Sequence, residues 1–206
     1  MNVQAIDNNI IITDVKDFSL RHIFGCGQCF RWDECEDGGF VGVAKGKVLK
    51  ISQVDDTITL YNTTISDFYD IWYDYFDFKT DYSKIKRELS KDDVLKKASE
   101  FGCGIRILNQ DFWECVVSFI ISASNNIPRI KKIISALCEN YGDEVSYMGK
   151  TYYTFPTPNK INSLSLDDLS VIKAGYRDKY IKAAAKAFVD GFSEDKFLEL
   201  SYDESK

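Results

Sequence analysis

The chain has 206 residues, of which 45% are hydrophobic and 14% aromatic, enough to bury a core in one large domain or two small ones. No apolar run reaches the roughly 18 to 20 residues that cross a bilayer, and the first residues lack the pattern of a secretion signal, so we expect a cytoplasmic protein without a membrane partner. The net charge of −6, taken alone, argues against nucleic-acid binding, because phosphate contacts need cations.

The first part of the chain predicts an antiparallel β-sheet, because short β-branched or alternating runs are separated by tight turns. The expected strands are "NIIITDV", "CFRWDE", "FVGVA", "KVLKIS" and "TITLYN". Period-two alternation in the last two predicts one packed and one solvated face. Phe30 and Trp32 fall on one side of the second run, and we expect both in the core.

The segment "CGQCFRW" precedes that second run. Gly25 and Gly27 flank Cys26, and glycines there indicate a bulge or the close approach of another chain or a ligand. Cys26 and Cys29 form a C-x-x-C pair, but no second pair of ligands follows at a useful distance, so we expect reduced thiols and no metal. A single histidine, His22, excludes a His-rich metal site and argues against a Ser-His-Asp triad.

After Thr64 the pattern becomes helical. Ser66 is a candidate N-cap for a helix whose apolar residues recur at helical spacing and are expected in the core: Phe68, Ile71, Trp72, Tyr75 and Phe76. The segment "YSKIKRELSKDDVLKKASEF" predicts further helix with breaks, and the glycines of "FGCGIRILNQ" mark a boundary.

From Asp111 onward the sequence predicts only helices. Asp111 is a candidate cap for an apolar helix from Phe112 to about Ala123, which we expect to be buried on all sides. Asn126 followed by Pro128 suits the start of the next helix. Later start and stop signals are the capping boxes Ser165–Asp168 and Ser201–Glu204, a cap at Ser193, and helix-ending glycines at Gly142, Gly175 and Gly191.

Cations gather in this second part in spite of the acidic total. Five lie between Lys173 and Lys186 against one acid, Asp178, and a second group is Arg129, Lys131 and Lys132. Because the local field decides where an anion binds, each group is a candidate phosphate contact. A solvated helix face is the alternative for each group taken separately.

Two junctions between helices carry the candidate contacts. At "SASNNIPRI", a helix start offers unpaired N–H groups, and Arg129 can add a bidentate contact to a base or phosphate. At "AGYRDKY", Tyr176 beside Arg177 can wedge into or stack on a base while the cation holds phosphate. The alternatives are a plain capped turn at the first junction and an interfacial tyrosine with a solvated arginine at the second.

Three segments in this order, "GQCFRW", "GIRILNQDFWECVVSFIISASNNIPRI" and "AGYRDKYI", resemble the 8-oxoguanine DNA glycosylase/abasic-site lyase family of the helix-hairpin-helix superfamily. The resemblance implies an α+β fold. Residues 1–105 would form an antiparallel sheet domain similar to the TATA-binding protein, and residues 106–206 a partial all-α glycosylase domain. It also implies base-excision repair, in which oxidised guanine is flipped out of duplex DNA and excised.

The resemblance implies a role for each matching residue. Gly27 would offer its backbone carbonyl to the N–H that marks the oxidised base. Other residues would fill the gap that the flipped nucleotide leaves in the duplex, or contact the orphaned cytosine or the opposite strand: Ser124, Asn125, Asn126, Arg129, Tyr176 and Arg177. Ser124 departs from the family, which usually has an asparagine there, so a shorter side chain would fill the gap less well.

The catalytic segment of the family has no match. Neither "GVG-x-K", which would supply the nucleophilic lysine, nor "PVD", which would supply the aspartate, occurs in the sequence. We therefore expect a C-terminally truncated member without the helix-hairpin-helix, with no catalytic residue and no cofactor. We expect it to be inactive alone and to bind oxidised duplex DNA weakly, as a monomer.

Three alternatives stay open. The first is an alkylated-base DNA glycosylase, which shares the plan of sheet plus helices. The second is a non-catalytic DNA-binding remnant, which would bind in a salt-dependent way without releasing a base. The third is a fragment that cannot fold, since loss of the last helices would expose the apolar "FWECVVSFIISA" segment.

Overall fold

The computed structural model describes residues 1–199, so the capping box predicted at Ser201–Glu204 lies outside the described residues. The chain divides into a sheet unit, Met1–Gln110, and a helical unit that begins at Asp111. Within the described residues, no helix is long and apolar enough to cross a membrane.

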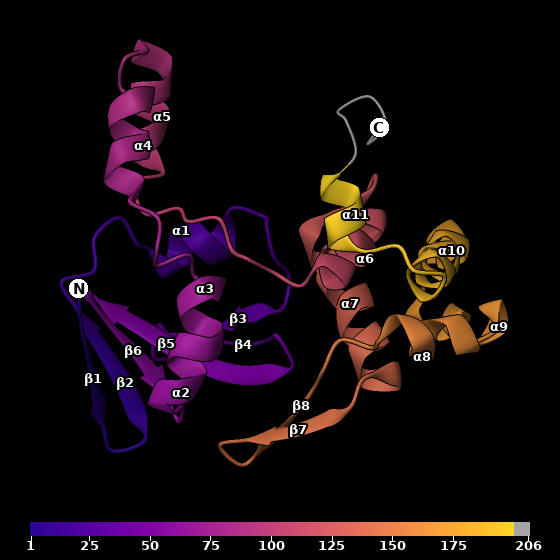
Figure 1. The fold of residues 1–206 in the computed structure, drawn as a ribbon. Coiled ribbons are helices and arrows are strands. Elements are labelled where there is room, and N and C mark those ends of the chain that lie inside the picture. Colours follow the sequence, from indigo (N-terminus) through magenta and orange to yellow (C-terminus); the bar gives the residue numbers. More distant parts are fainter. Residues whose placement is uncertain (200–206) are drawn as a thin grey trace. The chain divides into compact units, whose positions relative to one another are not determined.

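An antiparallel sheet of six strands organises the sheet unit (Figure 1). The strands are β1 (Asn2–Ile6), β2 (Asn9–Thr13), β3 (Trp32–Glu34), β4 (Phe40–Ala44), β5 (Lys47–Val54) and β6 (Thr57–Tyr61), in the order β1-β2-β6-β5-β4-β3. Strands β3 to β6 form the predicted meander, and β2 returns to pair with β6. The predicted α+β class is thus confirmed, while β1 was not foreseen because its residues are largely exposed and give no clear pattern.

The segment before β3 is helical, and the prediction that the first part of the chain is β throughout is wrong there. Helix α1 (Leu20–Gly25) begins at Ser19, whose hydroxyl accepts a hydrogen bond from the backbone N–H of His22. The strand expected over "CFRWDE" is reduced to its last three residues. Trp32 is buried as expected, but Phe30 precedes the strand and is only half-buried.

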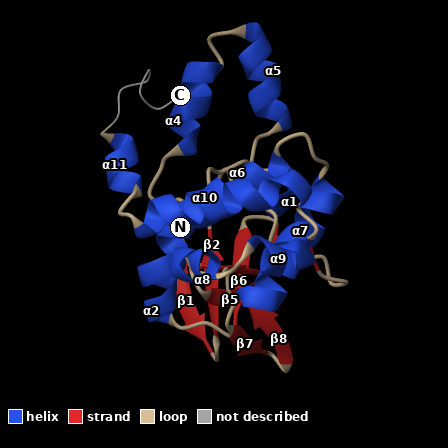
Figure 2. Cartoon of the chain, turned by 90° about the vertical axis from the view of Figure 1, so that its right-hand side faces the viewer, coloured by secondary structure: helices blue, strands red, loops and turns tan. Residues whose placement is uncertain are grey.

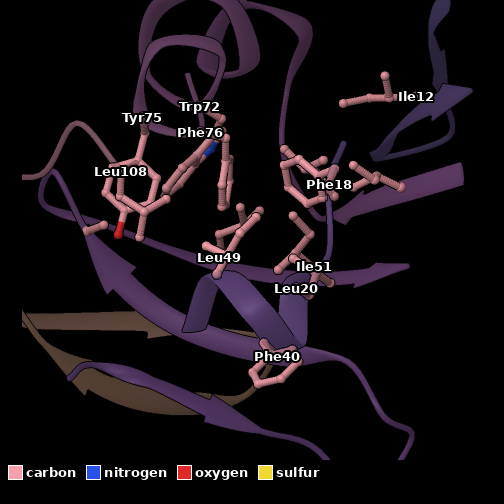
Figure 3. Packing of buried hydrophobic residues seen from close by; sticks show 14 of the residues in the cluster. Ile12, Phe18, Leu20, Phe40, Leu49, Ile51, Trp72, Tyr75, Phe76 and Leu108 are labelled. Atoms are coloured by element: carbon pink, nitrogen blue, oxygen red, sulfur yellow. The ribbon is translucent and has the colours of Figure 1, made fainter. Parts of the chain in front are cut away.

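Aromatic side chains from the following helical segment fill the core of the sheet unit (Figure 3). The segment consists of α2 (Ile65–Asp67), the π-helix η1 (Phe68–Trp72) and α3 (Tyr73–Tyr75). Thr64 is its N-cap, so the prediction of Ser66 is wrong by two residues. Phe68, Trp72, Tyr75 and Phe76 are buried as predicted, and Ile71 packs on the core half-buried.

Helices α4 (Tyr82–Leu89) and α5 (Asp93–Phe101) form a hairpin that stands away from the sheet (Figure 1). They match the helix with breaks that the sequence predicts. Every residue of both helices is exposed or half-buried, so the hairpin contributes little to the core.

Capped helices make up most of the helical unit: α6 (Phe112–Ser122), α7 (Ile127–Tyr141), α8 (Pro158–Ser163), α9 (Leu166–Leu169), α10 (Asp178–Val189) and α11 (Glu194–Leu198). Short 3₁₀ turns, η2 (Ser170–Ile172) and η3 (Gly175–Arg177), lie between α9 and α10. The predicted caps Asp111, Asn126 and Ser193 and the capping box Ser165–Asp168 are confirmed.

Three expectations for this unit need correction. It contains a two-stranded hairpin, β7 (Glu144–Tyr147) and β8 (Lys150–Tyr153), drawn in red in Figure 2, so helices are not its only elements. Helix α6 is not buried on all sides, because Phe119 is 78% exposed. The η2 turn ends at Lys173 in the left-handed conformation, and Gly175 starts the next 3₁₀ turn instead of ending the previous helix.

Candidate nucleic-acid interface

The loop between α6 and α7 is held by its own asparagines. The Asn125 amide donates to the carbonyl of Ile121 (3.0 Å), and its oxygen accepts from the backbone N–H of Asn126 (3.0 Å). The Asn126 oxygen accepts from the backbone N–H of Arg129 (3.1 Å), which caps α7. Ser124 is left-handed, with φ of 49°, a conformation that asparagine and glycine tolerate better than serine. The loop therefore has one defined backbone conformation.

Arg177 joins this loop to the second junction. Its side chain is buried, with 5% exposure, and its guanidinium donates to the carbonyls of Ala123 and Ser124. It also donates to the carbonyl of Ala174 (3.2 Å). Because one side chain bonds backbone on both sides, the two junctions predicted from the sequence lie next to each other.

We call the hydrogen bonds from Arg177 to both junctions the Arg177 clamp. The exposed residues of the two junctions form what we call the junction surface: Ser124, Asn126, Arg129 and Tyr176. In the part of the chain that the structure describes, the Arg129 guanidinium has no ion pair or hydrogen bond, so it is available to a ligand. Tyr176 is 57% exposed, yet its ring centroid lies 4.5 Å from the Arg177 guanidinium carbon and 6.3 Å from the ring centroid of Tyr180, in an edge-to-face arrangement. An exposed aromatic ring is thus held in place from two directions.

Two of the lysines counted in the sequence, Lys182 and Lys186, are engaged within the helical unit. Lys182 donates to the carbonyls of Asn162 and Leu164, and Lys186 pairs with Asp190 (2.6 Å). Burial raises the pKa of the Asp178 carboxyl, one of whose oxygens is buried without a hydrogen-bond partner among the described residues. The junction surface therefore depends on a few exposed groups more than on a broad basic face.

In the sheet unit, Gly27 lies in the loop of residues 26–30 that follows α1, here called the Gly27 loop. Gly27 is exposed and has φ of 85°, a conformation that L side chains rarely adopt. The side chain of the next residue, Gln28, anchors the loop by hydrogen bonds to the backbone of Ile23, Arg106 and Leu108. The structure thus presents Gly27 at the surface of a tethered loop.

The predicted site residues of the helical unit differ in exposure. Ser124, Asn126, Arg129 and Tyr176 are exposed, and Asn126 is a helix cap as well. The Asn125 amide is engaged inside the loop and the Arg177 guanidinium inside the clamp, so direct contact of either with DNA stays a prediction. The sequence did not single out Gln28 as an anchor or Tyr180 as the neighbour of Tyr176. The signal for Tyr180 was its spacing of four residues from Tyr176 at the start of a helix.

Comparison with known proteins assigns the family. The family model described as 8-oxoguanine DNA glycosylase, N-terminal domain, matches residues 10–116, more than half of the chain. The chain belongs to the 8-oxoguanine DNA glycosylase family. The N-glycosylase/DNA lyase of Saccharomyces cerevisiae is 40% identical over 93 residues, which are 44% of this family member and 25% of the yeast protein.

Solved structures extend the likeness to both units. The apo 8-oxoguanine glycosylase/lyase of Clostridium acetobutylicum is 40% identical with a TM-score of 0.94, over 98% of this chain and 72% of that chain. MBOgg1, solved with a low-affinity DNA ligand, is 46% identical with a TM-score of 0.93, over 98% of this chain and 71% of that chain. By contrast, the chain spans only about a quarter of the curated yeast relative.

Proposed function

We propose that this family member acts in base-excision repair as part of a DNA glycosylase and abasic-site lyase that excises oxidised guanine from duplex DNA. The junction surface carries the proposal, because it presents an unpaired arginine, a helix cap and an oriented, exposed tyrosine together on one unit. Such a set suits the place that a flipped nucleotide leaves in a duplex. The Clostridium enzyme has also been solved with duplex DNA containing cytosine opposite 8-oxoguanine.

In this proposal each residue has a distinct task. The Gly27 carbonyl accepts the additional N–H of the oxidised base. Arg129 reads the orphaned cytosine, because its fork of donors matches the acceptors of a base edge. Tyr176 wedges between bases of the opposite strand. Ser124, Asn125 and Asn126 line the gap, and the buried Arg177 holds their loop in place beside it.

The proposal includes the absence of a nucleophile from this polypeptide. We expect the chain to bind lesion DNA weakly and reversibly, as a cytoplasmic monomer, without releasing a base. Borohydride trapping with an 8-oxoguanine duplex tests this point, since a covalent adduct would reveal a nucleophilic lysine within these 206 residues.

Fluorescence anisotropy with matched duplexes at low salt tests the recognition itself. The wild-type chain should bind 8-oxoguanine opposite cytosine at least several-fold more tightly than undamaged duplex. Tyr176→Ala should weaken that binding about tenfold, the loss expected for one stacking contact. Tyr69→Ala is the matched control, because Tyr69 is 55% exposed but lies in the sheet unit. Equal losses in the two variants would exclude Tyr176 as a specific contact.

The alternatives predict other outcomes. An alkylated-base enzyme would prefer a methylated-base duplex; the 3-methyladenine glycosylase of Archaeoglobus fulgidus shares the fold, with a TM-score of 0.67 at 15% identity. A chain that cannot fold would show no cooperative melting and no lesion preference. A non-catalytic DNA-binding remnant would bind duplex DNA in a salt-dependent way without the preference for 8-oxoguanine opposite cytosine that our proposal predicts.

A further inference from the structure

Gln28 makes an unusually complete set of hydrogen bonds beside the exposed Gly27. Its side-chain nitrogen donates to the carbonyls of Ile23 (3.0 Å) and Arg106 (2.9 Å). Its side-chain oxygen accepts from the backbone N–H of Leu108 (3.0 Å). The backbone carbonyl of Gln28 accepts from the amide of Gln110 (2.7 Å). Both ends of the amide and the main chain of this residue are therefore fixed.

Gly27 itself has little to hold it. Apart from Gly27 and its chain neighbours Cys26 and Gln28, no described residue has a heavy atom within 4 Å of the position that a Cβ on Gly27 would occupy. A glycine is therefore needed at position 27 because of the backbone conformation, with φ of 85°, and not because a side chain would be crowded. Because glycine samples many conformations, an unanchored carbonyl at this position would point in many directions.

The bonds of Gln28 act directly on that carbonyl. The Gly27 carbonyl belongs to the planar peptide group that joins Gly27 to Gln28, so fixing Gln28 restricts the plane that contains the oxygen. The anchors lie in the last turn of α1 and in residues 106–110, which are 78 to 82 positions away in the chain. Three of the four bonds that fix the orientation of the carbonyl thus come from residues distant in the chain, and only the bond to Ile23 is local.

We propose that Gln28 is a positioning residue that orients the Gly27 carbonyl and so sets the preference for oxidised guanine over guanine. The inference rests on the proposed function, since it takes Gly27 as the group that meets the base. A hydrogen bond to one distinguishing N–H depends steeply on angle, so a freely turning carbonyl loses most of the discrimination while overall DNA affinity persists.

Gln28→Glu tests the proposal because it keeps the size and the acceptor for Leu108 but removes both donor bonds. Its matched control is Gln53→Glu. Gln53 is also half-buried, accepts from the backbone N–H of Leu20 (3.0 Å) and donates to two carbonyls, and among the described residues it has no hydrogen bond to the Gly27 loop. Both variants replace the same kind of amide clamp in the same unit.

The readout is the affinity of the chain for three duplexes with 8-oxoguanine, guanine or an abasic-site analogue opposite cytosine. Gln28→Glu should reduce the ratio of lesion to undamaged affinity about tenfold, the value of one well-formed hydrogen bond. Its affinity for the abasic duplex, which has no base to recognise, should stay within about twofold of wild type. Gln53→Glu should leave the affinity ratio unchanged.

Other outcomes overturn the proposal. An unchanged ratio in Gln28→Glu refutes the positioning role, and an equal loss on all three duplexes shows a merely structural one. If Gln28→Glu does not fold, Gln110→Ala removes the bond to the Gln28 carbonyl and should lower the ratio in the same direction. A wild-type chain without any lesion preference refutes the proposed function and this inference together, whereas a wild-type preference that survives both variants refutes the inference alone.

Discussion

Each unit buries an arginine that bonds three backbone carbonyls, but the two side chains are placed very differently. Arg106 in the sheet unit is 6% exposed and Arg177 in the helical unit 5%. In Arg106 each guanidinium nitrogen has a carbonyl partner, at 2.7 to 3.0 Å, and the rings of Phe18, Phe78 and Tyr82 surround the group. Burial lowers the pKa of the Arg106 guanidinium.

Arg177 is less completely satisfied. Its Nε is buried without a partner among the described residues, and one of its carbonyl contacts is as long as 3.3 Å. The ring that it contacts, Tyr176, is itself exposed. A buried arginine whose donors all have partners stabilises the fold. One with an unpaired donor beside exposed groups can also organise a binding surface. The comparison separates a structural arginine from one placed to organise a ligand site.

The largest effect should come from the structural arginine. Arg106→Met removes the partner of three carbonyls, one in a buried and two in partly buried hydrogen bonds, and we expect the free energy of unfolding of the sheet unit to fall by about 4 kcal/mol. Hydrogen–deuterium exchange resolved by unit, in a urea series, measures this. Arg106→Lys should lose less, because it keeps a charge but not the fork of donors. A loss below about 1 kcal/mol in the methionine variant would remove the distinction drawn here.

Arg177→Met should lower the free energy of unfolding of the helical unit by less, about 2 kcal/mol, because fewer of the hydrogen bonds of Arg177 are short and the ring that it contacts is exposed. Because Arg177 holds the loop and does not read a base, Arg177→Met should weaken lesion binding by a similar factor whichever base lies opposite.

Arg129→Gln should instead weaken binding mainly to duplexes with cytosine opposite the lesion, by about tenfold. Duplexes with cytosine, adenine or thymine opposite the lesion measure both. A cytosine-specific loss in Arg177→Met would make Arg177 a base reader like Arg129.

Ser124→Asn should stabilise the loop that Arg177 clamps. Asparagine adopts the left-handed conformation more readily than serine, so we expect a gain of up to about 1 kcal/mol in thermal unfolding. Ser122→Asn is the control, because Ser122 is helical and should give no gain. No stabilisation in Ser124→Asn would show that the positive φ at this position carries no strain.

Asp178→Asn should have the smallest effect and should depend on pH. Burial raises the pKa of Asp178, so its favourable contribution is present below the unfolded value of about 3.9 and is lost as the pH rises through the folded pKa. The asparagine variant should therefore gain a few tenths of a kcal/mol at pH 7, a value reduced by partial exposure, and nothing at pH 3. Thermal melts of wild type and Asp178→Asn at pH 7 and pH 3 measure the difference. A gain at pH 3 alone would show that burial does not disfavour the charged Asp178 carboxylate.

The sequence by itself determined the features whose partners are close in the chain. Asp111, Asn126 and Ser193 were identified as helix caps because a capping side chain bonds a backbone N–H within about three residues. The strands β4 to β6 followed from alternation and short turns, and the family followed from three motifs in order. The β7–β8 hairpin was missed because its turn, at Met148 and Gly149, lacks the usual Asn-Gly or Asp-Gly signal.

Only the tertiary structure decided how the candidate site is held. Arg177 looked like an exposed contact in the sequence, but its partners at Ala123 and Ser124 are more than fifty residues away. Gln28 looked unremarkable, although it bonds backbone groups some eighty residues away. Hydrogen bonds over such separations form only when the chain has folded, so local patterns show which residues carry chemistry and the packed backbone fixes where they point.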